Sequence, residues 1–143
     1  METREIQTLE ELNTLGKEII ARFVPKDGAQ VVALSGDLGA GKTAFVKLLA
    51  EQLGVTGEVT SPTFVVMKSY AIAEHPFLKT LTHIDAYRIE SDDEMRVLGF
   101  TELLADPTRL IAIEWPERIP DVIPQDAARI GFVLHGEVRT ITF

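Results

Sequence analysis

One stretch of this 143-residue sequence, residues 30–49, restricts the possible folds more than any other. It reads QVVALSGDLGAGKTAFVKLL, which is an apolar run, a glycine-rich segment and an apolar pattern with helical spacing. Gly36 and Gly41 are separated by four residues, and Lys42 and Thr43 follow directly. This spacing is that of a phosphate-binding loop between a β-strand and an α-helix. The stretch therefore predicts an α/β fold of the P-loop NTPase type.

The predicted loop contains the groups that bind nucleotide phosphates. Gly36, Gly39 and Gly41 permit positive φ angles, so that successive backbone N–H groups can face one concavity. The following helix adds its unpaired N–H groups and the positive end of its dipole. In such loops the lysine, here Lys42, reaches the β- and γ-phosphates, and the hydroxyl, here Thr43, is a ligand of Mg²⁺.

The length and composition predict a single domain over residues 1–143. Hydrophobic residues make up 45% of the sequence and charged residues 25%, which is typical of a soluble protein with a proper core. No apolar run is long enough to cross a membrane, and the acidic start METREIQTLEEL lacks the pattern of a signal peptide. The sequence has no cysteine, so a disulfide framework is excluded. We expect a cytoplasmic protein.

The charge bears on the possible partners. The formal net charge is −8, and lysines and arginines do not cluster along the sequence. Because nucleic-acid binding generally rests on a basic surface, we expect this chain to bind nucleic acid poorly by itself. The acidic surface is either a solvated face or a docking site for a basic partner.

The remaining patterns predict helices packed on a mixed sheet. A short connection between two strands implies antiparallel pairing next to the parallel core. We expect Ser91 and Glu94 to form a capping box, and three prolines to keep residues 116–124 extended or looped. A terminal hairpin is expected to turn at His135-Gly136. The predicted helices are 8–23 (with Thr8 as cap), the loop helix ending at Gly54, a helix from Ser91 towards Leu98, and 101–105; the predicted strands are 31–34, 65–72, 81–86, 109–114, 129–134 and 137–143.

Two predicted strands end in an acidic residue. Glu114 follows four apolar residues, and Asp85 ends a less apolar strand. The carboxyl ends of parallel strands lie at the edge of the sheet that carries the loop, so both acids are expected beside the nucleotide. One would ligate Mg²⁺ and the other would orient or deprotonate the attacking water. The alternatives are a water-exposed acid at Glu114 and a local partner for Asp85 in Tyr87 or Arg88.

Four further residues are candidates with weaker support. Trp115 should face away from Glu114 by strand alternation, either as a core or lid aromatic or as a contact near the nucleotide. Ser61 and Thr63 lie in a loop that is either a γ-phosphate sensor or a turn held by the Ser-Pro pair. His83 is interpreted as a structural histidine, because the histidines lack metal-ligand spacing.

Four segments together resemble the TsaE (YjeE) family. They are GDLGAGKT at 36–43, SPTF at 61–64, HIDAYRI at 83–89 and IEWPERI at 113–119, and they occur in the family's order and spacing. The resemblance spans nearly the whole chain. It implies a small bacterial ATPase with a P-loop α/β fold and a mixed sheet. It also implies a requirement in making threonylcarbamoyladenosine in tRNA, together with TsaD and TsaB, so that tRNA is reached only through these partners.

The resemblance also assigns roles to particular residues. Thr43 and Glu114 correspond to the family's magnesium ligands, Asp85 to its acid for hydrolysis, and 61–64 to its switch-like segment. Lys42, Asp85 and Glu114 are the expected catalytic residues, with ATP and Mg²⁺ as cofactors. The expected nucleotide-binding residues are Gly36, Asp37, Leu38, Gly39, Ala40, Gly41, Lys42, Thr43 and Trp115.

Two other functions of a P-loop domain remain open. A small-molecule kinase usually carries an arginine-bearing lid over the phosphates, whereas the eight arginines here are scattered along the sequence. A module that senses ATP without hydrolysing it would need the same loop but not the catalytic acid.

Overall fold

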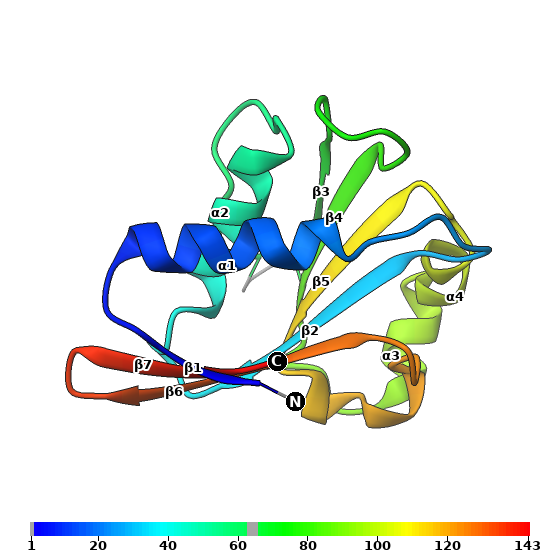
Figure 1. The fold of residues 1–143 in the computed structure, drawn as a ribbon. Helices are drawn as coiled ribbons and strands as arrows, with labels where there is room; N and C mark the ends of the chain where they lie inside the picture. Colours follow the sequence, from blue (N-terminus) through cyan, green and yellow to red (C-terminus); the bar gives the residue numbers. More distant parts are fainter. Residues whose placement is uncertain (1, 63–65) are drawn as a thin grey trace.

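The computed structural model describes residues 2–62 and 66–143, which fold around one seven-stranded sheet (Figure 1). The strand order is β1-β7-β6-β2-β5-β4-β3. β2 pairs in parallel with β5 and β6, and β5 pairs in parallel with β4, whereas β1, β3 and β7 pair antiparallel with their neighbours. The predicted mixed sheet is therefore confirmed. The strands are β1 (Thr3–Ile6), β2 (Gln30–Gly36), β3 (Met67–Ala71), β4 (Thr80–Asp85), β5 (Arg109–Glu114), β6 (Ala128–His135) and β7 (Val138–Thr142).

Helices cover both faces of the sheet and build a core on each. Figure 1 shows α1 and α2 on one side and α3 and α4 on the other. Alternate residues of β2 serve the two faces, since Val32 and Leu34 pack with the first pair of helices and Val31 and Ala33 with the second. No helix in the described part of the chain is long and apolar enough to span a membrane. The helices are α1 (Leu9–Ala21), α2 (Lys42–Gln52), α3 (Asp92–Val97) and α4 (Phe100–Leu104).

α1 forms where the apolar spacing predicts it. Thr8 is the N-cap, and its hydroxyl accepts a hydrogen bond from the Glu11 N–H at 3.1 Å. Leu12, Leu15 and Ile19, three or four residues apart, are buried against the sheet and α2. The helix thereby shields one face of the strands that carry the phosphate-binding loop.

Three local predictions are wrong in detail. Ser91 is the N-cap of α3 but makes no side-chain cap hydrogen bond, and the Glu94 carboxylate accepts from the Glu90 N–H at 3.2 Å and not from the Ser91 N–H. The proline segment forms two single turns of 3₁₀ helix (Pro116–Arg118 and Pro120–Val122), since a proline at the first position suits a helical turn.

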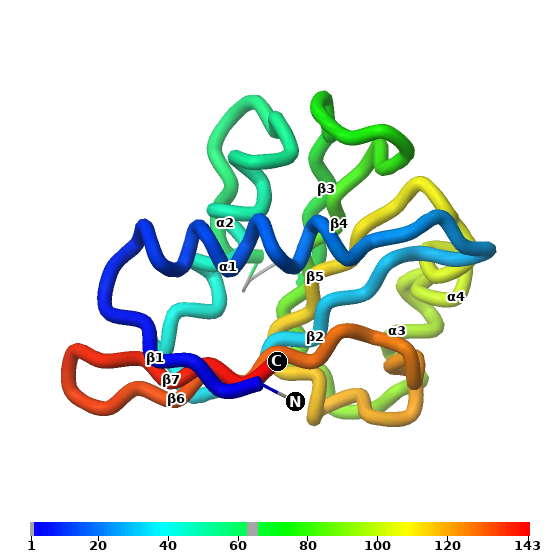
Figure 2. The backbone as a smooth tube through the Cα atoms, viewed as in Figure 1, coloured from blue at the N-terminus to red at the C-terminus, as the bar shows by residue number. Residues whose placement is uncertain are grey.

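The third error concerns the terminal hairpin and its neighbour. His135 pairs with Val138, so the turn residues are Gly136 and Glu137 and not His135-Gly136. On its other side, β7 pairs with β1, a short strand that the sequence patterns do not predict. The two ends of the described chain lie together (Figure 2), with the Glu2 N–H donating to the Phe143 carbonyl at 2.7 Å.

β2 can pass beside β6 only because its last residue is glycine. Gly36 has a φ of 142°, and a Cβ atom there would lie 2.5 Å from the backbone oxygen of Phe132. Both the backbone conformation and the contact therefore exclude a side chain.

Replacing Gly36 with alanine is expected to lower the free energy of unfolding by about 3 kcal/mol, through combined strain and steric clash. Chemical denaturation monitored by circular dichroism measures the change. Gly136→Ala is the matched control, because Gly136 has a φ of 65° but no atom within 4 Å of its added Cβ. Its expected cost is strain alone, about 1 kcal/mol. Equal effects of the two substitutions would contradict the role of the Phe132 contact.

Candidate nucleotide site

The loop between β2 and α2 has the backbone that its glycines predict. Gly36, Gly39 and Gly41 have φ angles of 142°, 80° and 112°. Gly41 is the N-cap of α2 and, being glycine, provides no side-chain cap. The first N–H groups of α2 thus remain available to an external acceptor, and the helix dipole favours an anion at this point.

This loop borders a cavity of about 330 Å³. The cavity lies at the carboxyl edge of the sheet, where β4 and β5 end next to β2. Asp85 and Glu114 are paired in register there, and Leu34 is the partner of Glu114 on the other side. The structure thus brings both predicted acids to the loop. The lining residues are Leu38, Gly39, Gly41, Lys42, Thr43, Ala44, Ser61, Asp85, Glu114, Trp115 and Arg139.

Three of the loop residues expected to bind nucleotide do not line this cavity. Ala40 is 1% exposed and packs into the core below the loop. Gly36 lies against Phe132, and Asp37 contributes its carbonyl to a turn with the Ala40 N–H at 3.1 Å. If Gly36 and Ala40 contact a phosphate, they do so through backbone atoms, because Gly36 has no side chain and that of Ala40 is in the core.

Lys42 is buried at the floor of the site. Its side chain is folded over the Trp115 ring, with Nζ 3.5 Å from the ring centroid, and it donates a hydrogen bond to the Gly36 carbonyl. Burial lowers the pKa of the Lys42 ammonium from its ordinary value, against the opposing attraction of nearby carboxylates, of which Glu114 is the strongest. The lysine is thus a desolvated cation at the N-terminus of α2.

Glu114 is held by two side chains from different elements. The Thr43 hydroxyl at the start of α2 donates to its two carboxylate oxygens at 2.9 and 3.1 Å. His83 Nε2, on β4, lies 2.6 Å from Glu114 Oε2, which is the carboxylate oxygen nearer to the Thr43 hydroxyl. The His83 ring is fully buried. Because a carboxylate only accepts, Nε2 carries the proton of this hydrogen bond. His83 therefore orients the carboxylate as well as filling the core.

Asp85 lies next to Glu114 at the end of β4. It is 8% exposed, and its Oδ1 accepts from the Tyr87 N–H at 3.0 Å. This contact fixes the carboxylate in a turn and leaves it on the wall of the cavity. Asp85 therefore has the local partner that was considered from the sequence, and it also lines the cavity.

Trp115 contacts both the core on the α3 and α4 side, as alternation predicts, and the cavity. Alternation would place it opposite Glu114, but its φ of 63° ends β5 and turns the chain. As a result Trp115 lines the same cavity as Glu114 and packs against Tyr87, with the ring centroids 5.0 Å apart. The tryptophan is thus next to the loop while it also packs against the core on the α3 and α4 side of the sheet.

The oxygen atoms present fit a magnesium ion. Mg²⁺ prefers hydroxyl, carboxylate and phosphate oxygens and commonly uses one or two protein ligands next to a nucleotide. The Thr43 hydroxyl and the Glu114 carboxylate, already in contact on the cavity wall, are a donor set of this kind. Across residues 2–62 and 66–143 there is no group of three or more His, Cys, Asp or Glu side chains placed to hold a metal.

The loop at 61–64 is described only in part. Ser61 is exposed and lines the cavity, and Pro62 is buried. Thr63 and Phe64 lie outside the described residues, so the expected switch-like segment remains a prediction.

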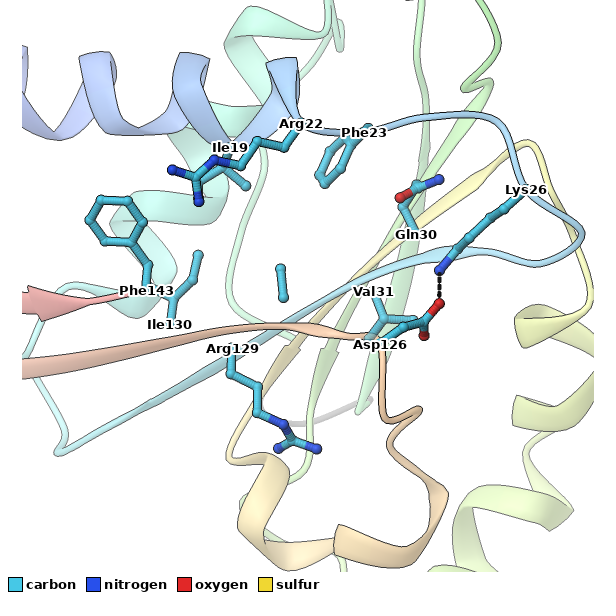
Figure 3. A pocket seen from close by; sticks show the side chains of 11 residues that line it. Ile19, Arg22, Phe23, Lys26, Gln30, Val31, Asp126, Arg129, Ile130 and Phe143 are labelled. Atoms are coloured by element: carbon cyan, nitrogen blue, oxygen red, sulfur yellow. Dashed lines mark hydrogen bonds and ion pairs between the residues drawn. The ribbon is translucent and has the colours of Figure 1, made fainter. Parts of the chain in front are cut away.

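A second cavity lies at the other end of β2. It has about 270 Å³ and is bordered by the end of α1 and the start of β6 (Figure 3). Lys26 and Asp126 form an ion pair of 2.8 Å across its rim. It contains none of the residues singled out from the sequence motifs, because it borders Gln30 and Val31, where β2 begins. The first cavity is therefore the candidate nucleotide site.

Reasoning from sequence missed the contact of His83, interpreted as structural, with Glu114, and it missed Arg139 altogether. His83 precedes Asp85 by two positions, and the two-residue period of a strand would have placed both on one face. Arg139 comes from β7, and no local pattern indicates that it reaches the loop.

Comparison with known proteins identifies the family of this chain. Residues 6–141 match the family model of the threonylcarbamoyl adenosine biosynthesis protein TsaE. The tRNA threonylcarbamoyladenosine biosynthesis protein TsaE of Bacillus subtilis is 39% identical over 135 residues, covering 94% of this chain and 79% of that protein. The protein of the same name from Treponema pallidum is 42% identical over 113 residues, covering 78% and 79%.

A solved structure matches the fold as well. The crystal structure of YdiB from Bacillus subtilis superposes with a TM-score of 0.74 at 30% identity, covering 98% of this chain and 82% of that one. Together, the family model, the relatives and the fold confirm the expected family. This chain belongs to the TsaE family.

Proposed function

We propose that this chain binds and hydrolyses MgATP in the biosynthesis of threonylcarbamoyladenosine in tRNA, and that it does so as an accessory to a TsaD–TsaB complex. The observation that carries this proposal is the meeting of three elements around one cavity: the glycine loop, Glu114 hydrogen-bonded to Thr43, and Asp85. The relatives named above carry the biosynthetic role in their names.

The loop binds the phosphates. The backbone N–H groups at the start of α2 donate hydrogen bonds to the phosphate oxygens, and Lys42 adds a desolvated cation that is drawn to the β- and γ-phosphates. Lys42 lines the cavity, with Nζ 3.5 Å from the centroid of the Trp115 ring. The loop thus supplies most of the binding.

Thr43 and Glu114 hold Mg²⁺, which when bound neutralises charge on the phosphate oxygens. His83 keeps the Glu114 carboxylate in place at 2.6 Å. Asp85 orients or deprotonates the water that attacks the γ-phosphorus. The bond from that phosphorus to its bridging oxygen breaks, and the products are ADP and inorganic phosphate.

The acidic character of the chain supports a protein partner over direct contact with tRNA. A net charge of −8 repels the phosphate backbone of a nucleic acid. The energy of hydrolysis is therefore expected to act on a neighbouring protein.

The test is to measure ATP hydrolysis by the purified chain with and without TsaD–TsaB. Slow hydrolysis alone and a stimulation of about tenfold or more by the complex are expected, as for a nucleotidase whose catalytic arrangement is completed by a partner. Full hydrolysis without partners would contradict the accessory role. Production of ADP that depends on an added small-molecule acceptor would instead indicate a kinase.

Asp85→Asn separates hydrolysis from ATP sensing. Asparagine keeps the acceptor for the Tyr87 N–H but cannot take a proton from water. We expect this variant to bind MgATP and to fail in supporting tRNA modification. Normal modification with it would favour a sensing module that does not need hydrolysis.

A further inference from the structure

The hairpin of β6 and β7 extends past the end of β2 and brings one arginine to the phosphate-binding loop. β2 ends at Gly36, paired with Phe132, whereas β6 continues to His135 before the chain returns in β7. Arg139 lies in β7, with Leu134 of β6 and Ile6 of β1 as its partners. Its backbone is therefore held on both sides, which makes it a rigid support for the side chain.

The Arg139 side chain lies on Gly41. A Cβ atom added to Gly41 would be 3.0 Å from Arg139 Nε and 3.4 Å from Cδ. Gly41 is the N-cap of α2, so the arginine lies where the helix presents its free N–H groups. In addition, Arg139 lines the cavity together with Lys42 and Thr43. It thus stands at the phosphate end of the site.

The Nε of Arg139 has no hydrogen-bond acceptor among the described residues. This nitrogen is buried, yet it makes no hydrogen bond with residues 2–62 or 66–143. A buried donor without a partner costs about 1–3 kcal/mol, and such groups are rare without a functional reason. The Nε–H of Arg139 is therefore available to donate to an anion in the cavity.

The cavity contains a second cation, Arg139, besides Lys42. Its charged lining consists of Lys42 and Arg139 against Asp85 and Glu114. In a chain of net charge −8, a nucleotide triphosphate needs local positive charge to bind. The planar fork of arginine suits phosphate oxygens better than a lysine ammonium does.

We propose that Arg139 is a phosphate-binding residue of this site, donating hydrogen bonds from β7 to the phosphate oxygens of the bound nucleotide. This inference rests on the proposed function, because it takes ATP as the ligand. The C-terminal hairpin is then part of the nucleotide site and not only the edge of the sheet. Glycine at position 41 permits the positive φ of the loop and also leaves room for the Arg139 side chain.

The test compares Arg139→Gln and Arg139→Lys with the unaltered chain. Isothermal titration calorimetry measures the Kd for MgATP at several salt concentrations, and thermal unfolding checks the fold. Loss of a charged phosphate contact is expected to raise the Kd about tenfold or more in Arg139→Gln and less in Arg139→Lys. The salt dependence of the Kd is expected to become shallower in Arg139→Gln, because one charge contact is missing. Arg129→Gln is the matched control. Arg129 is an exposed arginine on β6 that borders the second cavity and does not line the candidate nucleotide cavity.

The outcomes separate this inference from the proposed function. If the unaltered chain does not bind MgATP, both fail. If it binds and Arg139→Gln binds equally well, the role of Arg139 alone is overturned. A weaker Kd with an unchanged salt dependence and no recovery in Arg139→Lys would also overturn it, since that pattern indicates a packing role against Gly41.

Discussion

Replacing Lys42 with alanine is expected to abolish MgATP binding and to reduce hydrolysis about 100-fold or more, because a desolvated cation at the phosphates is lost. The fold should survive. The lost contacts with Trp115 and Gly36 are offset by relief of a buried charge, so the free energy of unfolding is expected to change by no more than about 1 kcal/mol. Calorimetric titration with MgATP and ADP release measure the two functional effects.

The matched control is Lys47→Ala. Lys47 is an exposed lysine on the same helix, so its removal changes the net charge equally without touching the cavity. Its MgATP binding should stay within about twofold of that of the unaltered chain. Retained binding in Lys42→Ala would remove this lysine from the phosphate site.

Replacing Glu114 with glutamine is expected to remove the Mg²⁺ dependence of hydrolysis and to lower the rate about 100-fold, because an amide oxygen is a poorer magnesium ligand than a carboxylate. Glutamine keeps an oxygen acceptor for Thr43 and His83, which limits the structural cost. Titration of the hydrolysis rate with Mg²⁺ measures the effect.

Glu117→Gln controls for the loss of charge alone. Glu117 is exposed and attracts Lys42 electrostatically, but it does not line the cavity. Its Mg²⁺ titration is expected to match that of the unaltered chain, with a rate changed by less than about threefold. An unchanged Mg²⁺ titration in Glu114→Gln would exclude this carboxylate as the metal ligand.

The strand, the glycine-rich loop and the helix of the candidate phosphate site were predictable because the sequence signals for them are local. Gly36, Gly41, Lys42 and Thr43 lie within eight consecutive residues, and the backbone geometry follows from glycine's conformational freedom. The places of Asp85 and Glu114 were predictable for a second reason. Parallel strands end at one edge of a sheet, so an acid directly after an apolar strand is carried to that edge.

Errors arose where one residue's backbone or a distant partner decided the outcome. Trp115 also reaches the cavity beside Glu114, because its positive φ ends β5, and no periodicity reveals this. β1 is a four-residue strand without a clear pattern of its own, and it exists because β7 pairs with it from the other end of the chain. Such pairing joins residues that are nearly the whole length of the chain apart.

By itself, the sequence determined the P-loop α/β class, the family, and the residues from which a magnesium nucleotide site would be built. Only the tertiary structure decided how that site is completed. It joined His83 to Glu114, turned Trp115 onto Lys42, and laid Arg139 of the terminal hairpin on Gly41. The physical reason is that motif spacing and apolar periodicity describe neighbours along the chain. Contacts between separate strands depend on the order in which the sheet places them, and here that order sets β7 two strands from β2.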